Sequence, residues 1–299
     1  MELQGQLEEL TDAGIGIAAI SYDSVETLNE FAQRRGITFP LLSDKDSAVI
    51  TDFGILNTVV QEALGPNGND PEVVEDVYRY VAAEVFDSPA LRRMIYGTPF
   101  PGTFMLNANG EVTTRFFEEF YRERASTSSI LLESGIGLSP IEAVRGETAQ
   151  LSFTAFPSTT VVTNGTRFSL VVDVEPSEGM HVYAPGADEN GYRVISFNMA
   201  PSQFVRYESV EYSESEIYHF APLDEDVDVY QEPFTIVQDV VMAASAEIEE
   251  ELAGMDAITL SGTLDYQACD DAICYLPVSV PISFTLEFQN LDYVRSQTR

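Results

Sequence analysis

The chain has 299 residues, a length typical of two domains, and hydrophobic residues make up 44% of it. Its 49 acidic and 15 basic residues give a formal net charge of −34, which excludes nucleic acids and anionic lipid surfaces as partners, because both are polyanions. There is no run of about 18 apolar residues, so we expect no direct insertion into a membrane, and the acidic start lacks the features of a signal peptide.

Helical and strand patterns alternate along residues 1–134, which predicts an α/β domain. The predicted elements are, in chain order, a helix over 2–12, a buried parallel strand over 14–20, a helix over 25–34 capped by Ser24, a short strand over 39–42, a short helix opened by Asp44, mostly helical structure over 58–97, a hairpin of 103–106 and 112–114 around the turn 107–110, and a helix over 125–133.

The pattern changes after residues 135–149, which we interpret as a linker. Short alternating segments separated by turn residues then predict an antiparallel β-sandwich over 150–290, followed by a tail at 291–299. The predicted strands are 151–156, 168–174, 194–199, 234–241, 258–266 and 278–288, and only 244–254 has a helical pattern.

Several segments of the first domain carry a family resemblance. They are Ile20–Ser24, Gly36–Asp44, Phe53–Gly54 and Pro101–Phe104, followed by Asn109–Gly110. Together they resemble the peroxiredoxin-like (AhpC/TSA, redoxin) branch of the thioredoxin fold over roughly residues 1–115. The resemblance implies a thioredoxin-like α/β domain with an antioxidant, redoxin-type role.

The redox cysteine of that family would lie at the start of the helix predicted over 2–12, but no cysteine precedes Cys269. We expect that the sequence starts late and lacks the cysteine segment; the alternative is a non-catalytic scaffold. In either case we expect the first domain to be inactive as given. Pro101 stands where thioredoxin-like proteins keep a cis-proline beside the reactive disulfide, although an ordinary turn proline is the competing interpretation.

Cys269 and Cys274 are the only two cysteines, and strand patterns lead into and out of the bend between them. Opposed positions in a hairpin lie about 4.5–5.5 Å apart, which suits a disulfide. Closing so short a loop stabilises the fold by only about 2 kcal/mol, so reversible exchange is a better use of the pair than a structural bridge. A zinc site is a third interpretation, but it would need both cysteines together with His181 and His219.

The segment Tyr266–Pro277 closely resembles the N-terminal periplasmic domain of the DsbD thiol–disulfide interchange proteins. The resemblance extends over roughly 150–290 and implies an immunoglobulin-like sandwich with a cap loop, placed here at 219–225. It also places His181 and Tyr183 near the disulfide. For His181, a role in proton transfer competes with that of an ordinary strand residue.

Tyr266 and Tyr275 flank the pair, and we expect them to shield the sulfurs together with Tyr183, which the resemblance places there. Asp270 and Asp271 are interpreted as a solvated turn; if they face the thiols, they raise the thiol pKa.

The sequence as a whole predicts a thiol–disulfide oxidoreductase that transfers reducing equivalents through Cys269 and Cys274, without cofactor or metal. A binding or scaffold protein that docks a redox partner is the alternative. The resemblance implies protein thiols and disulfides as partners, a membrane electron-transfer protein among them. It also implies a periplasmic or otherwise extracytoplasmic location. Because the chain as given shows no signal peptide, a cytoplasmic location is the alternative.

Overall fold

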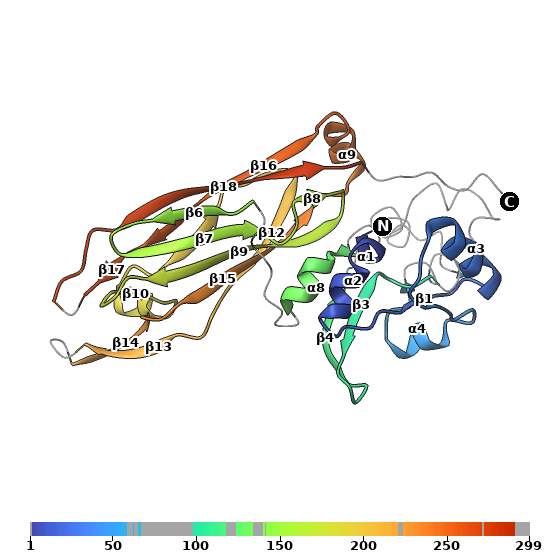
Figure 1. The fold of residues 1–299 in the computed structure, drawn as a ribbon, viewed down its shortest axis with the longest axis horizontal. Helices are drawn as coiled ribbons and strands as arrows, with labels where there is room; N and C mark the ends of the chain where they lie inside the picture. Colours follow the sequence, from blue (N-terminus) through green and yellow to red (C-terminus); the bar gives the residue numbers. More distant parts are fainter. Residues whose placement is uncertain are drawn as a thin grey trace. The chain divides into compact units, whose positions relative to one another are not determined.

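The computed structural model describes residues 2–58, 62, 65–66, 98–117, 124–133, 140, 142–220, 224–270 and 272–290 (Figure 1). The chain divides into two compact units, Met1–Ile136 and Gly137–Arg299. None of the helices in the described part of the chain combines the length and the apolar character that a membrane span requires.

The first unit mixes helices with short strands. Its described elements are α1 (Glu2–Gly5), α2 (Leu7–Asp12), β1 (Ala19–Ser21), α3 (Val25–Arg35), β2 (Leu41–Ser43), α4 (Ala48–Asp52), β3 (Gly102–Leu106), β4 (Val112–Phe117), β5 (Arg124–Ala125) and α8 (Thr127–Glu133). The helix predicted over 2–12 is present, with a break at Gln6 between α1 and α2. The structure predicted over 58–97 lies almost wholly outside the described residues.

Two helices of this unit begin at the side chains that the sequence indicates. The Ser24 hydroxyl accepts a hydrogen bond from the Thr27 amide at 3.2 Å and caps α3. The Asp44 carboxylate accepts hydrogen bonds from the amides of Ala48 and Ile50 at 3.0 and 2.8 Å. Asp44 therefore satisfies amides of the first turn of α4 that have no partner within the helix.

Four strands of the first unit, β1 with β2 and β3 with β4, form two separate two-stranded sheets among the described residues. β1 and β2 are parallel and are connected through α3, whereas β3 and β4 form the predicted antiparallel hairpin. The strand predicted over 14–20 is wrong for its first five residues. Only Ala19–Ser21 is paired, because the partner strand β2 is three residues long.

The second unit consists mostly of strands. Its elements are β6 (Val144–Glu147), β7 (Leu151–Pro157), β8 (Val161–Val162), β9 (Thr166–Pro176), β10 (His181–Tyr183), the 3₁₀ helix η2 (Ala187–Asn190), β11 (Ser196–Met199), β12 (Val205–Tyr212), β13 (Glu216–Phe220), β14 (Glu225–Tyr230), β15 (Phe234–Met242), α9 (Ala246–Leu252), β16 (Ala257–Tyr266), β17 (Ala268–Cys269) and β18 (Val278–Phe288).

Two of its sheets enclose one hydrophobic core. One sheet has the order β12-β15-β9-β7-β6 and the other β11-β16-β18-β8. Their long strands alternate buried and exposed residues; in β18, every second residue from Ile282 to Phe288 is buried. The core includes Leu170, Ile236, Leu260, Leu264 and Leu286. The predicted sandwich is confirmed, and each of the six predicted strands overlaps an observed one.

A third sheet, with the order β13-β14-β10-β17, lies at the end of this unit opposite α9 (Figure 1). The short strand β10 lies between its two neighbours. It pairs with β14 through Val182 and Tyr183, and with β17 through His181 and Val182. The alternating pattern did not predict this sheet, and Cys269 lies in its edge strand β17.

The linker predicted over 135–149 overlaps the sandwich and needs correction. β6 (Val144–Glu147) pairs with β7 along its whole length, so this stretch belongs to the second unit. A strand at the sheet edge needs only one partner and shows a weak sequence pattern, which explains the error. The predicted tail over 291–299 lies outside the described residues.

We predict that Gly262→Ala lowers the free energy of unfolding by about 1–3 kcal/mol, the usual cost of overpacking. A Cβ at this position would lie 2.5 Å from the Asn198 carbonyl oxygen and 2.6 Å from Met199 Sδ. Urea unfolding followed by circular dichroism measures the change. The matched control is Gly254→Ala, where no atom lies within 4 Å of the new Cβ. Equal stability of the two variants would contradict the prediction.

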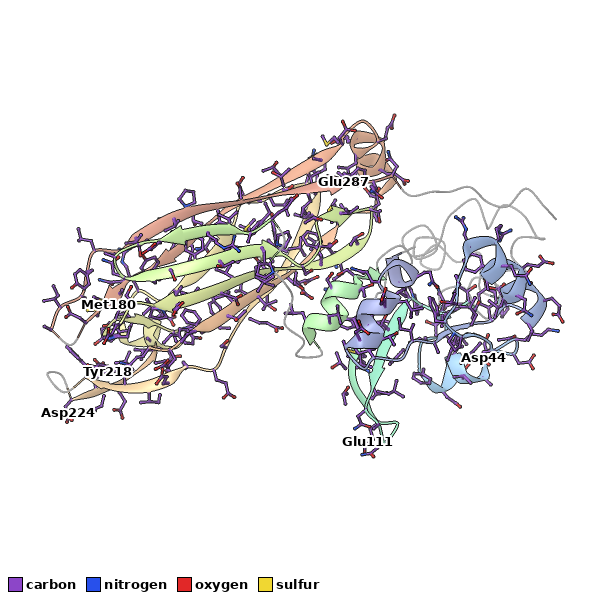
Figure 2. All side chains as sticks on the ribbon, viewed as in Figure 1. Asp44, Glu111, Met180, Tyr218, Asp224 and Glu287 are labelled. Atoms are coloured by element: carbon purple, nitrogen blue, oxygen red, sulfur yellow. A yellow bond between two sulfur atoms is a disulfide. The ribbon has the colours of Figure 1, made fainter. Side chains whose placement is uncertain are left out.

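We also predict that the midpoint of thermal unfolding rises between about 0.05 and 0.5 M NaCl. The net charge of −34 makes the folded chain repel itself, and salt screens that repulsion over a Debye length of about 10 Å at 0.1 M. Exposed carboxylates occur in both units, for example those of Glu111, Asp224 and Glu287 (Figure 2). A midpoint that stays constant or falls over this range would argue against self-repulsion.

Candidate redox site

Cys269 and Cys274 form a disulfide across a tight turn, with their Cα atoms 4.0 Å apart. The two residues face each other as an antiparallel bridge, so the predicted bend is confirmed. Backbone hydrogen bonds close the turn from the Asp270 amide to the Ile273 carbonyl and from the Tyr275 amide to the Ala268 carbonyl, at 3.0 and 2.9 Å. The pair is therefore held in disulfide geometry by the backbone around it.

Asp270 organises this turn, which corrects its interpretation as a merely solvated residue. One carboxylate oxygen accepts hydrogen bonds from the amides of Ala272 and Ile273, and the other accepts from the Tyr275 hydroxyl, all at 2.8 Å. The Ile273 amide, followed by the Ala272 amide and the Tyr275 hydroxyl, lowers the pKa of Asp270. The carboxylate thus stays ionised and fixes the turn that carries Cys274. Asp271 lies outside the described residues.

The two sulfur-bearing residues differ in their access to solvent. Cys269 is only 2% exposed, whereas Cys274 belongs to the exposed residues. Cys269 packs in a small cluster of buried residues at this end of the unit, together with Tyr183, Ala187, Val227 and Val229. A reagent that approaches from solvent therefore meets Cys274 first.

Tyr183 lies directly beside the disulfide, as the resemblance implied. Its hydroxyl oxygen is 3.2 Å from Cys269 Sγ and 3.4 Å from Cys274 Sγ. A disulfide sulfur carries no hydrogen, so the phenol is the donor in both contacts. The Tyr183 ring is 5% exposed and stacks on Tyr192 at 4.3 Å between centroids. Burial is the main reason that the pKa of Tyr183 rises to about 12.

His181 is also at the site. It is 3% exposed and lies opposite Cys269 in the register of β10 and β17. Its ring meets Tyr183 edge-on at 5.6 Å and Tyr218 at 4.8 Å between centroids. Figure 2 shows Tyr218 at this end of the second unit. His181 is thus a buried strand residue in contact with the aromatic residues around the disulfide.

The two tyrosines that flank the pair in the sequence have different surroundings. Tyr266 is buried in the sandwich core, and its hydroxyl donates to Thr148 Oγ1 at 2.8 Å. Tyr275 donates to Asp270 and so supports the turn. Tyr183, which the resemblance placed near the disulfide, contacts both sulfurs. Its stacking partner Tyr192, which the sequence interpretation missed, packs against the same cluster as Cys269.

Pro101 does not have the predicted cis bond, since no cis peptide occurs among the described residues. Pro101 directly precedes β3, where the missing amide hydrogen leaves no strand partner unsatisfied. The trans form is favoured at proline by about 0.5–1 kcal/mol in the absence of other constraints. Pro101 belongs to the first unit, whereas the disulfide belongs to the second.

The predicted cap loop at 219–225 connects β13 and β14, but residues 221–223 lie outside the described residues. His219 belongs to β13 and is exposed, and its ring lies 2.8 Å from a carboxylate oxygen of Asp226. This contact directs His219 toward the neighbouring strand β14.

Two protein-family models match the chain. The AhpC/TSA family model matches residues 1–115, and the model "Thiol:disulfide interchange protein DsbD, N-terminal" matches residues 150–285. Among curated proteins, a putative peroxiredoxin of Mycobacterium tuberculosis is 42% identical over 53 residues, and peroxiredoxin Bcp of Escherichia coli is 40% identical over 53 residues. Each match covers 18% of this chain and 34% of the relative, so the chain spans about a third of these relatives.

Two solved structures are similar to this chain at low identity. The Neisseria meningitidis DsbD N-terminal domain in the reduced form has a TM-score of 0.26 and 17% identity, covering 40% of this chain and 78% of that chain. The N-terminal periplasmic domain of ScsB from Proteus mirabilis has a TM-score of 0.32 and 12% identity, covering 49% and 50%.

The family matches confirm the two resemblances and the predicted order of fold classes. The chain combines a thioredoxin-like segment that matches the AhpC/TSA family with a β-sandwich that matches the N-terminal domain family of DsbD and carries a cysteine pair at disulfide distance.

Proposed function

We propose that the chain is a thiol–disulfide exchange protein that passes reducing equivalents through Cys269 and Cys274. The observation that carries the proposal is the unequal exposure of the pair, with Cys274 open to solvent and Cys269 buried. A purely structural bridge gains nothing from one accessible half. An exchange centre needs one sulfur that a partner can reach and a second that is shielded until the bond breaks.

The exchange takes place in two balanced steps. A partner thiolate attacks Cys274 Sγ, the bond between the two cysteines breaks, and Cys269 leaves with the electron pair as a thiolate. In the mixed disulfide, the first partner sulfur is bonded to Cys274 Sγ. A second thiolate of the partner then attacks that partner sulfur, and Cys274 leaves as a thiolate. The pair ends as two thiols after taking up two protons, and the partner ends as a disulfide. The reverse sequence oxidises the pair.

Exposed apolar side chains on both sides of Cys274 support a protein as the exchange partner. Ile273 is 57% exposed and Leu276 is 86% exposed, and both belong to the segment that carries the accessible sulfur. Apolar contacts beside the reacting atoms are typical of the buried centre of a protein–protein interface. We extend the proposal to protein thiols and disulfides, a membrane electron-transfer protein included, and to an extracytoplasmic location, on the strength of the DsbD family match.

The first domain has a different part in this proposal. Both cysteines of the chain lie in the second unit, so the AhpC/TSA segment as given supplies no thiol of its own. The proposed exchange therefore takes place in the second unit. The alternative for the whole chain is a binding or scaffold protein, in which the sandwich docks a redox partner and the first domain is inert.

We predict that the pair titrates with a midpoint above about −300 mV in glutathione or dithiothreitol redox buffers. Disulfides with a purely structural role resist reduction at such potentials. The measurement is alkylation of free thiols at each potential followed by mass analysis, started from both the oxidised and the reduced protein. A bridge that stays oxidised well below −300 mV would favour the scaffold alternative.

We further predict that the two single-thiol variants react unequally with glutathione disulfide. Cys269→Ser leaves the exposed Cys274 thiol and should form a mixed disulfide at least about tenfold faster than Cys274→Ser, which leaves the buried Cys269 thiol. Mass analysis of quenched samples gives the rates. The control repeats both reactions in denaturant, where the difference should disappear. Equal rates in the folded state would remove the basis for Cys274 as the attacked residue.

A further inference from the structure

Breaking the disulfide leaves a negative charge on a sulfur that water hardly reaches. Cys269 is 2% exposed and packs among Val227, Val229 and Ala187. A thiolate in apolar surroundings is strongly disfavoured, because burial penalises the charged form. If the exchange starts at Cys274, as proposed above, the leaving sulfur therefore needs a hydrogen-bond donor inside the protein.

We propose that Tyr183 is a catalytic residue of the exchange, whose hydroxyl donates a hydrogen bond to Cys269 Sγ as that sulfur leaves as a thiolate. The inference rests on the proposed function. The Tyr183 hydroxyl lies 3.2 Å from the leaving sulfur and 3.4 Å from the attacked one. A single phenol thus contacts both reacting atoms before the bond breaks, and it can follow the charge to Cys269 without rearrangement of the backbone.

Tyr183 keeps its proton throughout the exchange. Burial, followed by the nearby Tyr192, Tyr218 and Glu225, raises the pKa of its phenol to about 12. The negative charge that forms on Cys269 raises the pKa of the phenol further, because a nearby like charge disfavours the phenolate, so the proton remains on the phenol oxygen. The residue therefore stabilises the thiolate by a charge-assisted hydrogen bond.

The hydroxyls of two neighbouring tyrosines are engaged elsewhere. The Tyr192 hydroxyl donates to Glu225 at 2.9 Å, and the Tyr275 hydroxyl donates to Asp270 at 2.8 Å. The Asp270 carboxylate is negative and cannot donate. The His181 ring is nearly perpendicular to the Tyr183 ring, with 81° between their planes, and is tilted by 30° against the Tyr218 ring. Among the described hydrogen bonds, those of Tyr183 are the ones that reach the sulfurs.

The test removes only the hydroxyl, in Tyr183→Phe, and keeps the ring that stacks on Tyr192. Two quantities are measured. The first is the rate at which dithiothreitol reduces the disulfide. The second is the pKa of the Cys269 thiol, from the pH dependence of iodoacetamide alkylation in a Cys274→Ala background. We expect a reduction rate about tenfold lower and a thiol pKa about one unit higher, the usual effect of losing a charge-assisted hydrogen bond.

Tyr230→Phe is the matched control. Tyr230 is also buried, its pKa is also raised to about 12 by burial, and its hydroxyl donates to the Ser213 carbonyl at 2.8 Å rather than to a sulfur. This variant should change neither the rate nor the thiol pKa. A Tyr183→Phe variant that reacts like the wild type, or a Tyr230→Phe variant that is equally impaired, would overturn the inference and leave the proposed function intact.

A second substitution keeps the test decisive if Tyr183→Phe folds poorly. 3,5-Difluorotyrosine incorporated at position 183 retains the ring and makes the phenol a stronger donor, so it should lower the pKa of the Cys269 thiol. An unchanged or raised thiol pKa would contradict the inference. A wild-type disulfide that dithiothreitol does not reduce would instead overturn the proposed function, and the two failures are therefore distinguishable.

Discussion

The pairing of β10 with β17 is the interaction on which the redox site depends. It places His181 opposite Cys269, and Tyr183, two residues further on, projects to the same face of the strand. β14 pairs with the other side of β10, opposite Val182 and Tyr183. A slip of one residue would turn every side chain of β10 to the opposite face, so the position of the phenol beside the sulfurs follows from the register of a sheet.

This register separates the two halves of the disulfide. Cys269 lies within the sheet and is buried, whereas Cys274 lies on the far side of a turn held by the Asp270 carboxylate and is exposed. The short loop adds little stability, so the arrangement acts mainly on reactivity. One sulfur is accessible to a partner, and the other has a hydrogen-bond donor where water is excluded.

The sequence predicted the sandwich well, because its long strands alternate buried and exposed residues over enough positions to be recognised. It predicted the smaller sheet poorly. β10 has three buried residues in succession and β13 has none, so neither shows a period of two. In the first unit, the apolar run over 14–20 predicts one long strand, although only its last residues pair with the three-residue strand β2. Strand length there depends on a partner that local sequence does not reveal.

The residues of the site also differ in how far the nearby sequence predicts them. The cysteine pair followed from spacing, and His181 and Tyr183 from resemblance, but Tyr192 joins through a turn that no pattern marks. The prediction that Tyr266 shields the sulfurs is wrong, because successive residues of a strand face opposite sides of the sheet. Leu264, Tyr266 and Ala268 occupy alternate positions and all pack in the sandwich core, so Cys269, the next residue, must face the other way. Tyr183 lies on that opposite face. The Cys269 sulfur therefore depends on the Tyr183 hydroxyl as its hydrogen-bond donor, because the apolar sandwich core has no donor to offer.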